Sequence, residues 1–187
     1  MQPLLGIGCL LYTSDSSKDA EANPDGLDFV LQGSRIDLLE NKVALVVPEG
    51  NPANIQSFAD IANCSSIALG NDDVPVGQYS TEILTNLGFL EDLEKGSKIT
   101  YGSNVKEVTT QVSEGTVDCG IIYATDAFSA GLTVVDEAAA DMCKQVIYPA
   151  AVLNVSKHPE AAQAFLDYLQ GEEAMAVFQS VGFAPAA

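Results

Sequence analysis

Basic residues are scarce in this chain of 187 residues. Eight lysines and arginines stand against 26 aspartates and glutamates, which gives a formal net charge of −18. Nucleic acids and anionic membrane surfaces bind proteins through clustered basic side chains, so this composition argues against both as partners. A small anion is still compatible with the charge, because local backbone N–H groups can bind it while salt screens distant carboxylates.

Several sequence motifs of catalysis and metal binding are missing as well. The chain contains no P-loop, no G-x-G-x-x-G and no G-x-S-x-G, and its cysteines form no C-x-x-C pair. We therefore expect no cofactor, no catalytic residue and no zinc ribbon or thioredoxin-like site. Small buried thiols are the preferred interpretation of the cysteines, although a disulfide between Cys119 and Cys143 is an alternative. The four cysteines are Cys9, Cys64, Cys119 and Cys143.

Long apolar runs are also absent. The apolar segment Met1 to Leu11, MQPLLGIGCLL, is too short to span a bilayer and lacks the basic residues that begin a signal peptide. Gly8-Cys9 has a faint similarity to a lipoprotein cleavage site. We interpret the segment as an N-terminal strand or a chain boundary.

A metal site is the obvious alternative for the loop that contains Asp72 and Asp73. A calcium loop needs alternating oxygen ligands and a glutamate at its twelfth position, but these aspartates are adjacent and the twelfth residue from Asp72 is Ile83. The only histidine, His158, precedes a proline and is expected on the surface. A metal-dependent hydrolase would have to use Asp72, Asp73, Asp126 and His158, and we do not favour it.

What the sequence does contain is a repeated order of strand and helix. The continuous apolar run VALVV at 43–47 indicates a buried strand, and amphipathic segments alternate with further apolar runs after it. This order predicts an α/β fold with a largely parallel sheet. Strands are expected at 43–47, 66–69, 98–101, 118–123, 132–135 and 145–153, and helices at 54–62, 78–87, 105–114, 159–169 and 172–181.

Three junctions between a strand and the following helix stand out, at 72–77, 103–105 and 123–126. In parallel sheets, ligands lie beyond the carboxyl ends of the strands and against the starts of helices. A helix start carries unpaired N–H groups and a partial positive charge, so several converging starts can bind an anion without basic side chains. Each junction alone is also compatible with an ordinary connection whose donors face water.

The donors at these junctions can be named from the sequence. Gly77 has no Cβ and permits close approach. Asn104 with Glu107 resembles a capping box, which makes the next residue the first of a helix with a free N–H. At the third junction, Tyr123 ends the strand expected at 118–123 and offers both an amide and a hydroxyl. The candidate ligand-binding residues are therefore Val76, Gly77, Val105 and Tyr123.

Five segments together resemble the periplasmic molybdate-binding proteins of ABC transporters. The resemblance implies two α/β lobes joined by a strand hinge, with a tetrahedral oxyanion, molybdate or tungstate, held in the cleft by neutral donors. It places the donors of the second lobe at the Val76 amide, the Val105 amide and the Tyr123 hydroxyl. The segments are GSRIDLLENKVALVVPEGN, IALGNDDVPVGQYSTEILTNLGF, GIIYATDA, VIYPAAV and AFLDYLQGEEAMAVFQSVGF.

The chain departs from this family at its start. Tyr12 to Lys18, YTSDSSK, is similar to the family's third strand. In the family, the segments that carry two oxyanion-binding serines of the first lobe come before this strand. The residues before Tyr12 are too few to contain those segments. We therefore expect a two-lobe periplasmic-binding-protein-like fold with mainly parallel sheets and a truncated first lobe. Residues 1–46 and 150–187 would form that lobe, and 47–149 the second. An incomplete sheet could pair with another copy of the chain as a homodimer.

The resemblance implies a function in transport. The chain would be a solute-binding protein outside the cytoplasmic membrane that captures molybdate or tungstate and delivers it to an ABC transporter permease. It would not be an enzyme. Two alternatives stay open beside the hydrolase: the ligand-sensing domain of a regulator, and a degenerate or truncated fragment with weak or no ligand binding.

Overall fold

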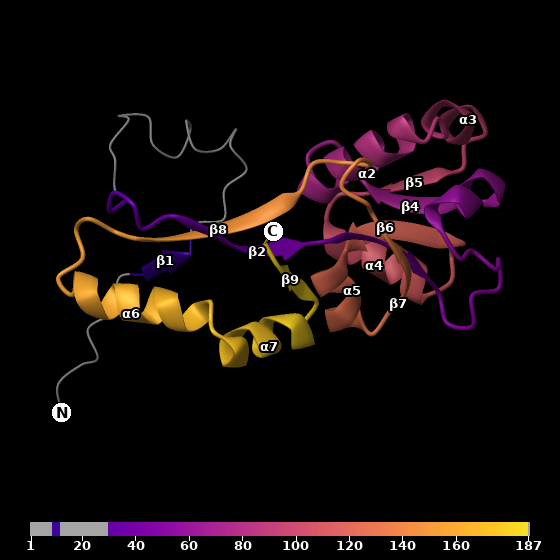
Figure 1. The fold of residues 1–187 in the computed structure, drawn as a ribbon. Coiled ribbons are helices and arrows are strands. Elements are labelled where there is room, and N and C mark those ends of the chain that lie inside the picture. The colour runs from indigo at the N-terminus through magenta and orange to yellow at the C-terminus, as the bar shows by residue number, and fades with distance from the viewer. Residues whose placement is uncertain (1–8, 12–29, 187) are drawn as a thin grey trace. The chain divides into compact units, whose positions relative to one another are not determined.

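The computed structural model describes residues 9–11 and 30–186, which divide into two compact units (Figure 1). Unit 1 comprises the chain up to Glu40, Ile147–Ser180 and the residues from Ala184 on, and unit 2 comprises Asn41–Val146 and Val181–Phe183. The sequence placed the first boundary after residue 46. In the structure, unit 2 begins six residues earlier, because Val43–Val47 pairs with two strands of that unit.

Unit 1 is built around a four-stranded sheet in the order β1-β8-β2-β9. β1 (Cys9–Leu11) pairs antiparallel with β8 (Val146–Val152), and β2 (Ile36–Asn41) and β9 (Phe183–Pro185) complete the sheet. Two helices follow β8, α6 (Pro159–Leu169) and α7 (Glu172–Ser180). β2 and β9 were not predicted as strands, and the segment 12–18 lies outside the described residues.

Unit 2 contains a five-stranded sheet in the order β5-β4-β6-β3-β7. β4 (Ile67–Gly70) runs parallel to both β5 (Ile99–Gly102) and β6 (Cys119–Tyr123), whereas β3 (Val43–Val47) is antiparallel to β6 and to β7 (Thr133–Glu137). The sheet is therefore mixed. Only Lys42 separates β2 from β3, although the two strands belong to different sheets.

Helices cover both faces of the unit 2 sheet (Figure 1). Along β3, Leu45 belongs to the core cluster that includes Ile83 of α2 (Pro75–Asn86), and Val46 belongs to the cluster of α4 (Val105–Ser113). Successive strand residues point to opposite faces, so the continuous apolar run reflects burial on both sides. The remaining helices are α3 (Leu90–Lys95), α5 (Ala124–Ala130) and the 3-10 helix η1 (Phe58–Asn63).

Three local expectations differ from the structure. The helix predicted at 54–62 is the shorter η1, because Asn54 has a φ of 53° and Ser57 begins the helix instead. The helix predicted from residue 78 begins at Pro75, since proline fits the first helical position, where no N–H is needed. α3 was not predicted at all.

The cysteines and the helix lengths can also be compared with expectation. Cys64, Cys119 and Cys143 are unbridged buried thiols, so the alternative disulfide between Cys119 and Cys143 is not formed. No helix within residues 30–186 is long and apolar enough to cross a membrane.

Candidate functional site

The three junctions predicted from the sequence lie at one edge of the unit 2 sheet. Gly70 at the end of β4 is opposite Gly102 at the end of β5, and Ala68 is opposite Gly120 of β6. The two strands on either side of β4 run in its direction, so their carboxyl ends share the edge, with Tyr123 closing β6. We call this edge the carboxyl edge of unit 2.

At the first junction, the loop after β4 folds back on Asn71. The N–H of Val74 donates to the Asn71 carbonyl at 3.0 Å, and the N–H of Asp73 donates to Asn71 Oδ1 at 3.1 Å. Pro75 then begins α2 and has no N–H. Within the described part of the chain, the N–H of Val76 has no acceptor, although its side chain is fully buried. This N–H is therefore a buried hydrogen-bond donor without an acceptor among the described residues.

Gly77 has a packing role that differs from the donor role predicted for it. Its N–H donates to the Val74 carbonyl at 2.8 Å and is not free. A Cβ at residue 77 would lie 2.3 Å from the Asn71 carbonyl oxygen and 2.5 Å from that of Gly70. Close approach is indeed what the glycine permits, but the approach is that of α2 to the end of β4.

At the second junction, Asn104 caps α4. Its Oδ1 accepts the N–H of Glu107 at 3.0 Å, and Glu107 Oε2 accepts the N–H of Ser103 at 2.7 Å. In a standard capping box, the Glu107 carboxylate would accept the N–H of the cap residue Asn104. Here it accepts the N–H of Ser103, one residue earlier. Hydrogen bonding, chiefly from the Ser103 N–H, holds the pKa of Glu107 below its usual range. The N–H of Val105 has no acceptor among residues 30–186.

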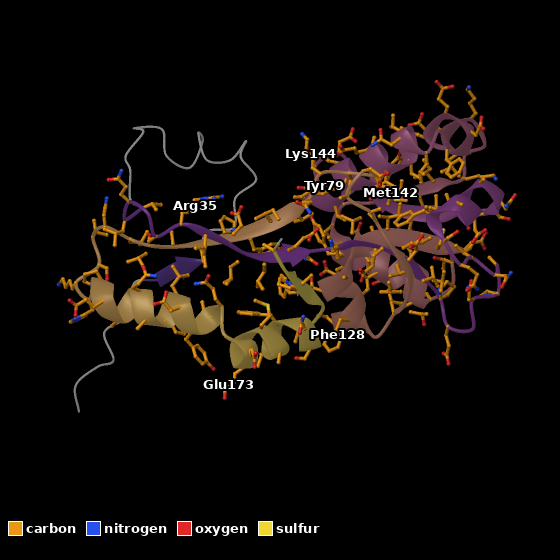
Figure 2. The ribbon with its side chains drawn as sticks, viewed as in Figure 1. Arg35, Tyr79, Phe128, Met142, Lys144 and Glu173 are labelled. Atoms are coloured by element: carbon orange, nitrogen blue, oxygen red, sulfur yellow. The ribbon has the colours of Figure 1, made fainter. Side chains whose placement is uncertain are left out.

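At the third junction, Tyr123 is the last residue of β6 and the cap of α5. Its ring is half-buried and packs against the main core cluster, edge-on to Tyr79 of α2 with 6.4 Å between ring centroids. Tyr79 and Met142, both labelled in Figure 2, pack against the same core. A tyrosine at this place can present its hydroxyl while its ring stays in apolar surroundings.

Two residues beside the third junction were not singled out from the sequence. Tyr79 lies within the helix expected at 78–87 but was not proposed as a site residue, and Asn41 was not considered. Asn41 is 2% exposed, and its Nδ2 donates to Thr125 Oγ1 at 2.9 Å, while its Oδ1 has no hydrogen-bond partner among the described residues. A lone buried amide has no sequence signal, because its burial depends on strand pairing.

The acidic residues near the carboxyl edge do not form a metal site. Across residues 30–186, no three His, Cys, Asp or Glu side chains are grouped closely enough to hold a metal ion. Asp72 and Asp73 are exposed in the loop, and His158 lies in unit 1 at the start of α6. Burial raises the pKa of Asp126. The hydrolase interpretation loses its required cluster, and the usable groups at the edge are neutral donors.

Comparison with known proteins identifies the class. The family model described as "Bacterial extracellular solute-binding protein" matches residues 11–184. "Putative ABC transporter substrate-binding lipoprotein YvgL" of Bacillus subtilis is 37% identical over 180 residues, which cover 95% of this chain and 68% of the relative. The molybdate-binding protein ModA of Escherichia coli is 31% identical over 180 residues, which cover 87% of this chain and 67% of ModA.

A solved structure gives the same result. The "substrate binding domain of putative molybdenum ABC transporter from Clostridium difficile" superimposes with a TM-score of 0.82 at 25% identity, covering 93% of this chain and 76% of that structure. The fold is that of solute-binding proteins, which confirms the predicted α/β class. The chain belongs to the bacterial extracellular solute-binding protein family.

Proposed function

We propose that this chain binds a tetrahedral oxyanion, molybdate or tungstate, at the carboxyl edge of unit 2. The proposed donors are the N–H of Val76, the N–H of Val105 and the hydroxyl of Tyr123. The observation that carries the proposal is that both helix starts at this edge have an N–H without an acceptor in the described chain. Gly77 supports the site by allowing α2 to approach β4.

Neutral donors suit this ligand physically. The N-terminus of a helix carries a partial positive charge of about half a unit, and α2 and α4 both begin at the same sheet edge. Hydrogen bonds to a charged group contribute about 1.5–3 kcal/mol each. Such fixed dipoles offset the repulsion of a strongly acidic chain, because the distant carboxylates are screened over roughly 10 Å in salt.

The choice of oxyanion and of pathway is supported by the relatives. One is named a molybdate-binding protein, and two further names refer to ABC transporters. We propose accordingly that the chain functions outside the cytoplasmic membrane and delivers its ligand to an ABC transporter permease. Molybdate and tungstate have nearly the same size and charge, so one site should accept both, whereas the smaller sulfate should bind more weakly.

Isothermal titration calorimetry with molybdate, tungstate and sulfate tests the proposal. Tyr123→Phe removes only the hydroxyl and is expected to weaken molybdate binding about 10- to 100-fold, which corresponds to one charge-assisted hydrogen bond. Tyr168→Phe is the matched control, because Tyr168 is an exposed tyrosine on α6 of unit 1. It should bind molybdate as the unaltered chain does.

Two results would contradict the proposal. If none of the three anions releases heat or raises the melting temperature, the chain is not an oxyanion-binding protein, and the degenerate-fragment interpretation takes its place. If Tyr123→Phe and Tyr168→Phe bind molybdate equally well, the site lies elsewhere.

A further inference from the structure

Two cysteines meet at the amino ends of the central strands of unit 2. Cys64 directly follows η1, three residues before β4 begins, and Cys119 is the first residue of β6. β4 and β6 are neighbours in parallel register, with Ile67 opposite Cys119. Both thiols belong to the same core cluster and are 1% and 0% exposed, respectively.

The backbone around these two cysteines is fastened by Asp118. Its Oδ2 accepts the N–H of Ser65 at 2.6 Å and the N–H of Ser66 at 3.2 Å. In return, the N–H of Asp118 donates to the Ser66 carbonyl at 3.1 Å. These bonds link the residue after Cys64 to the residue before Cys119. The two cysteines are therefore held against each other by contacts that do not involve sulfur.

The thiols are also unequal in acidity. Interaction with Cys119 lowers the pKa of Cys64, helped by the charge of Lys98, whose Nζ donates to the Cys64 carbonyl at 2.7 Å. Interaction with Cys64, together with burial, raises the pKa of Cys119. Cys64 is therefore the more acidic of the two thiols in the folded chain, and a thiolate is the nucleophile of disulfide exchange.

We propose that Cys64 and Cys119 form an intramolecular disulfide when the chain folds in the presence of a disulfide oxidant. The Cys64 thiolate attacks a small-molecule disulfide such as oxidised glutathione, which forms a mixed disulfide and releases one thiolate. Cys119 loses its proton and attacks the Cys64 sulfur, which releases the second thiolate. The two cysteines lose two electrons and two protons, and the oxidant is reduced to two thiols.

The location of this bond separates it from the proposed ligand site. Cys64 and Cys119 lie at the amino ends of their strands, whereas Val76 and Tyr123 follow the carboxyl ends. The bond joins residues 64 and 119, and closing so long a loop restricts the unfolded chain. We expect the oxidised chain to melt roughly 5–15 °C higher than the reduced chain. Any oxyanion affinity should change by less than about twofold, since no donor moves.

The experiment is refolding of the reduced, denatured full chain in mixed oxidised and reduced glutathione. Free thiols are then counted by alkylation in denaturant, and the bond is located by peptide mapping without reduction. The expected result is the loss of two of the four thiols, with a single linkage between Cys64 and Cys119 in monomeric chains. Cys64→Ala and Cys119→Ala should abolish it. Cys143→Ala, at another buried cysteine of the same cluster, should retain it.

The unaltered chain alone decides the outcome, even if a variant fails to fold. Four free thiols after refolding in excess oxidised glutathione would overturn the proposal, and so would a linkage that maps to Cys9 or Cys143. Equal melting temperatures of the oxidised and reduced chains would show that the bond does not form in the folded arrangement described here. None of these results depends on whether the chain binds an oxyanion.

Discussion

The N–H of Asn71 donates a hydrogen bond to the carbonyl of Gly102 at 2.9 Å. This bond ties the loop after β4 to the end of β5, so the start of α2 and the start of α4 are anchored to the same pair of strands. The N–H groups of Val76 and Val105 thus belong to helix starts that follow two paired strands, and we expect binding to require little reordering of either start. Preorganised donors of this kind bind with less loss of entropy.

The N–H of Val105 can be removed without disturbing the helix. Proline is favoured at the first position of a helix, and Asn104 has the extended conformation, φ −159° and ψ 165°, that a following proline requires. Val105→Pro is therefore expected to weaken molybdate binding about 10- to 100-fold, through loss of one charge-assisted hydrogen bond. Calorimetry measures the affinity, and circular dichroism shows whether the helix is intact.

Val105→Ala provides the control for this substitution. It removes more of the partly buried side chain than proline does but keeps the N–H. We expect its affinity to stay within about threefold of that of the unaltered chain. Equal losses in the alanine and proline variants would mean that the side chain, and not the N–H, matters at residue 105.

Gly77 should be intolerant of any side chain. In Gly77→Ala the new Cβ would meet two backbone carbonyl oxygens, and backbone cannot move aside as a flexible side chain can. We expect a loss of about 2–3 kcal/mol in the free energy of unfolding, measured with urea. Gly171→Ala, where one carbonyl lies 3.1 Å from the added carbon, should cost less than about 1 kcal/mol. The reverse order of the two variants would contradict the packing role.

Glu107 should make the folded chain sensitive to acid. Its pKa is lowered from an ordinary value of 4.5, chiefly by the hydrogen bond from the Ser103 N–H. A lowered pKa in the folded state means that the contribution to stability is present above about pH 4.5 and is lost as the pH falls through the folded-state pKa. The melting temperature of the unaltered chain should therefore approach that of Glu107→Gln on acidification.

Glu114→Gln is the comparison for this pH series. The Glu114 side chain has no hydrogen bond within the described residues. The melting temperature of Glu114→Gln should run parallel to that of the unaltered chain as the pH is lowered from 7 into the acid range. A Glu107→Gln curve that is equally parallel would show that the Ser103 bond does not contribute to stability.

Asp118 should stabilise unit 2 through its two bonds to backbone N–H groups. Asp118→Ala leaves the N–H groups of Ser65 and Ser66 without their acceptor, and we expect a loss of about 1–3 kcal/mol in the free energy of unfolding. Asp118→Asn keeps an oxygen in place and should lose less. Asp141→Ala, at an exposed aspartate, should change stability by under about 0.5 kcal/mol in the same urea titration. Equal stability of Asp118→Ala and Asp141→Ala would contradict this role.

Much of the local structure in both units could be predicted from neighbouring residues in the chain. The apolar run at Val43–Val47, the helix Pro159–Leu169 of unit 1 and the cap at Asn104 all depend on neighbours in the chain, which is why their positions were predicted closely. β2 and β9 were missed because they carry little apolar alternation and are strands only through pairing in the sheet. The reversed direction of β3 could not be predicted, because strand direction depends on topology.

The sequence by itself determined that three strand-to-helix junctions would carry neutral donors in a strongly acidic chain, since helix starts, caps and composition are local properties. Only the tertiary structure decided that these junctions share one sheet edge, that the Gly77 N–H is already bonded and that Cys119 faces Cys64. The physical reason is that strand register and packing join residues far apart in the chain, whereas hydrogen-bonding capacity and conformational preference belong to each residue and its neighbours.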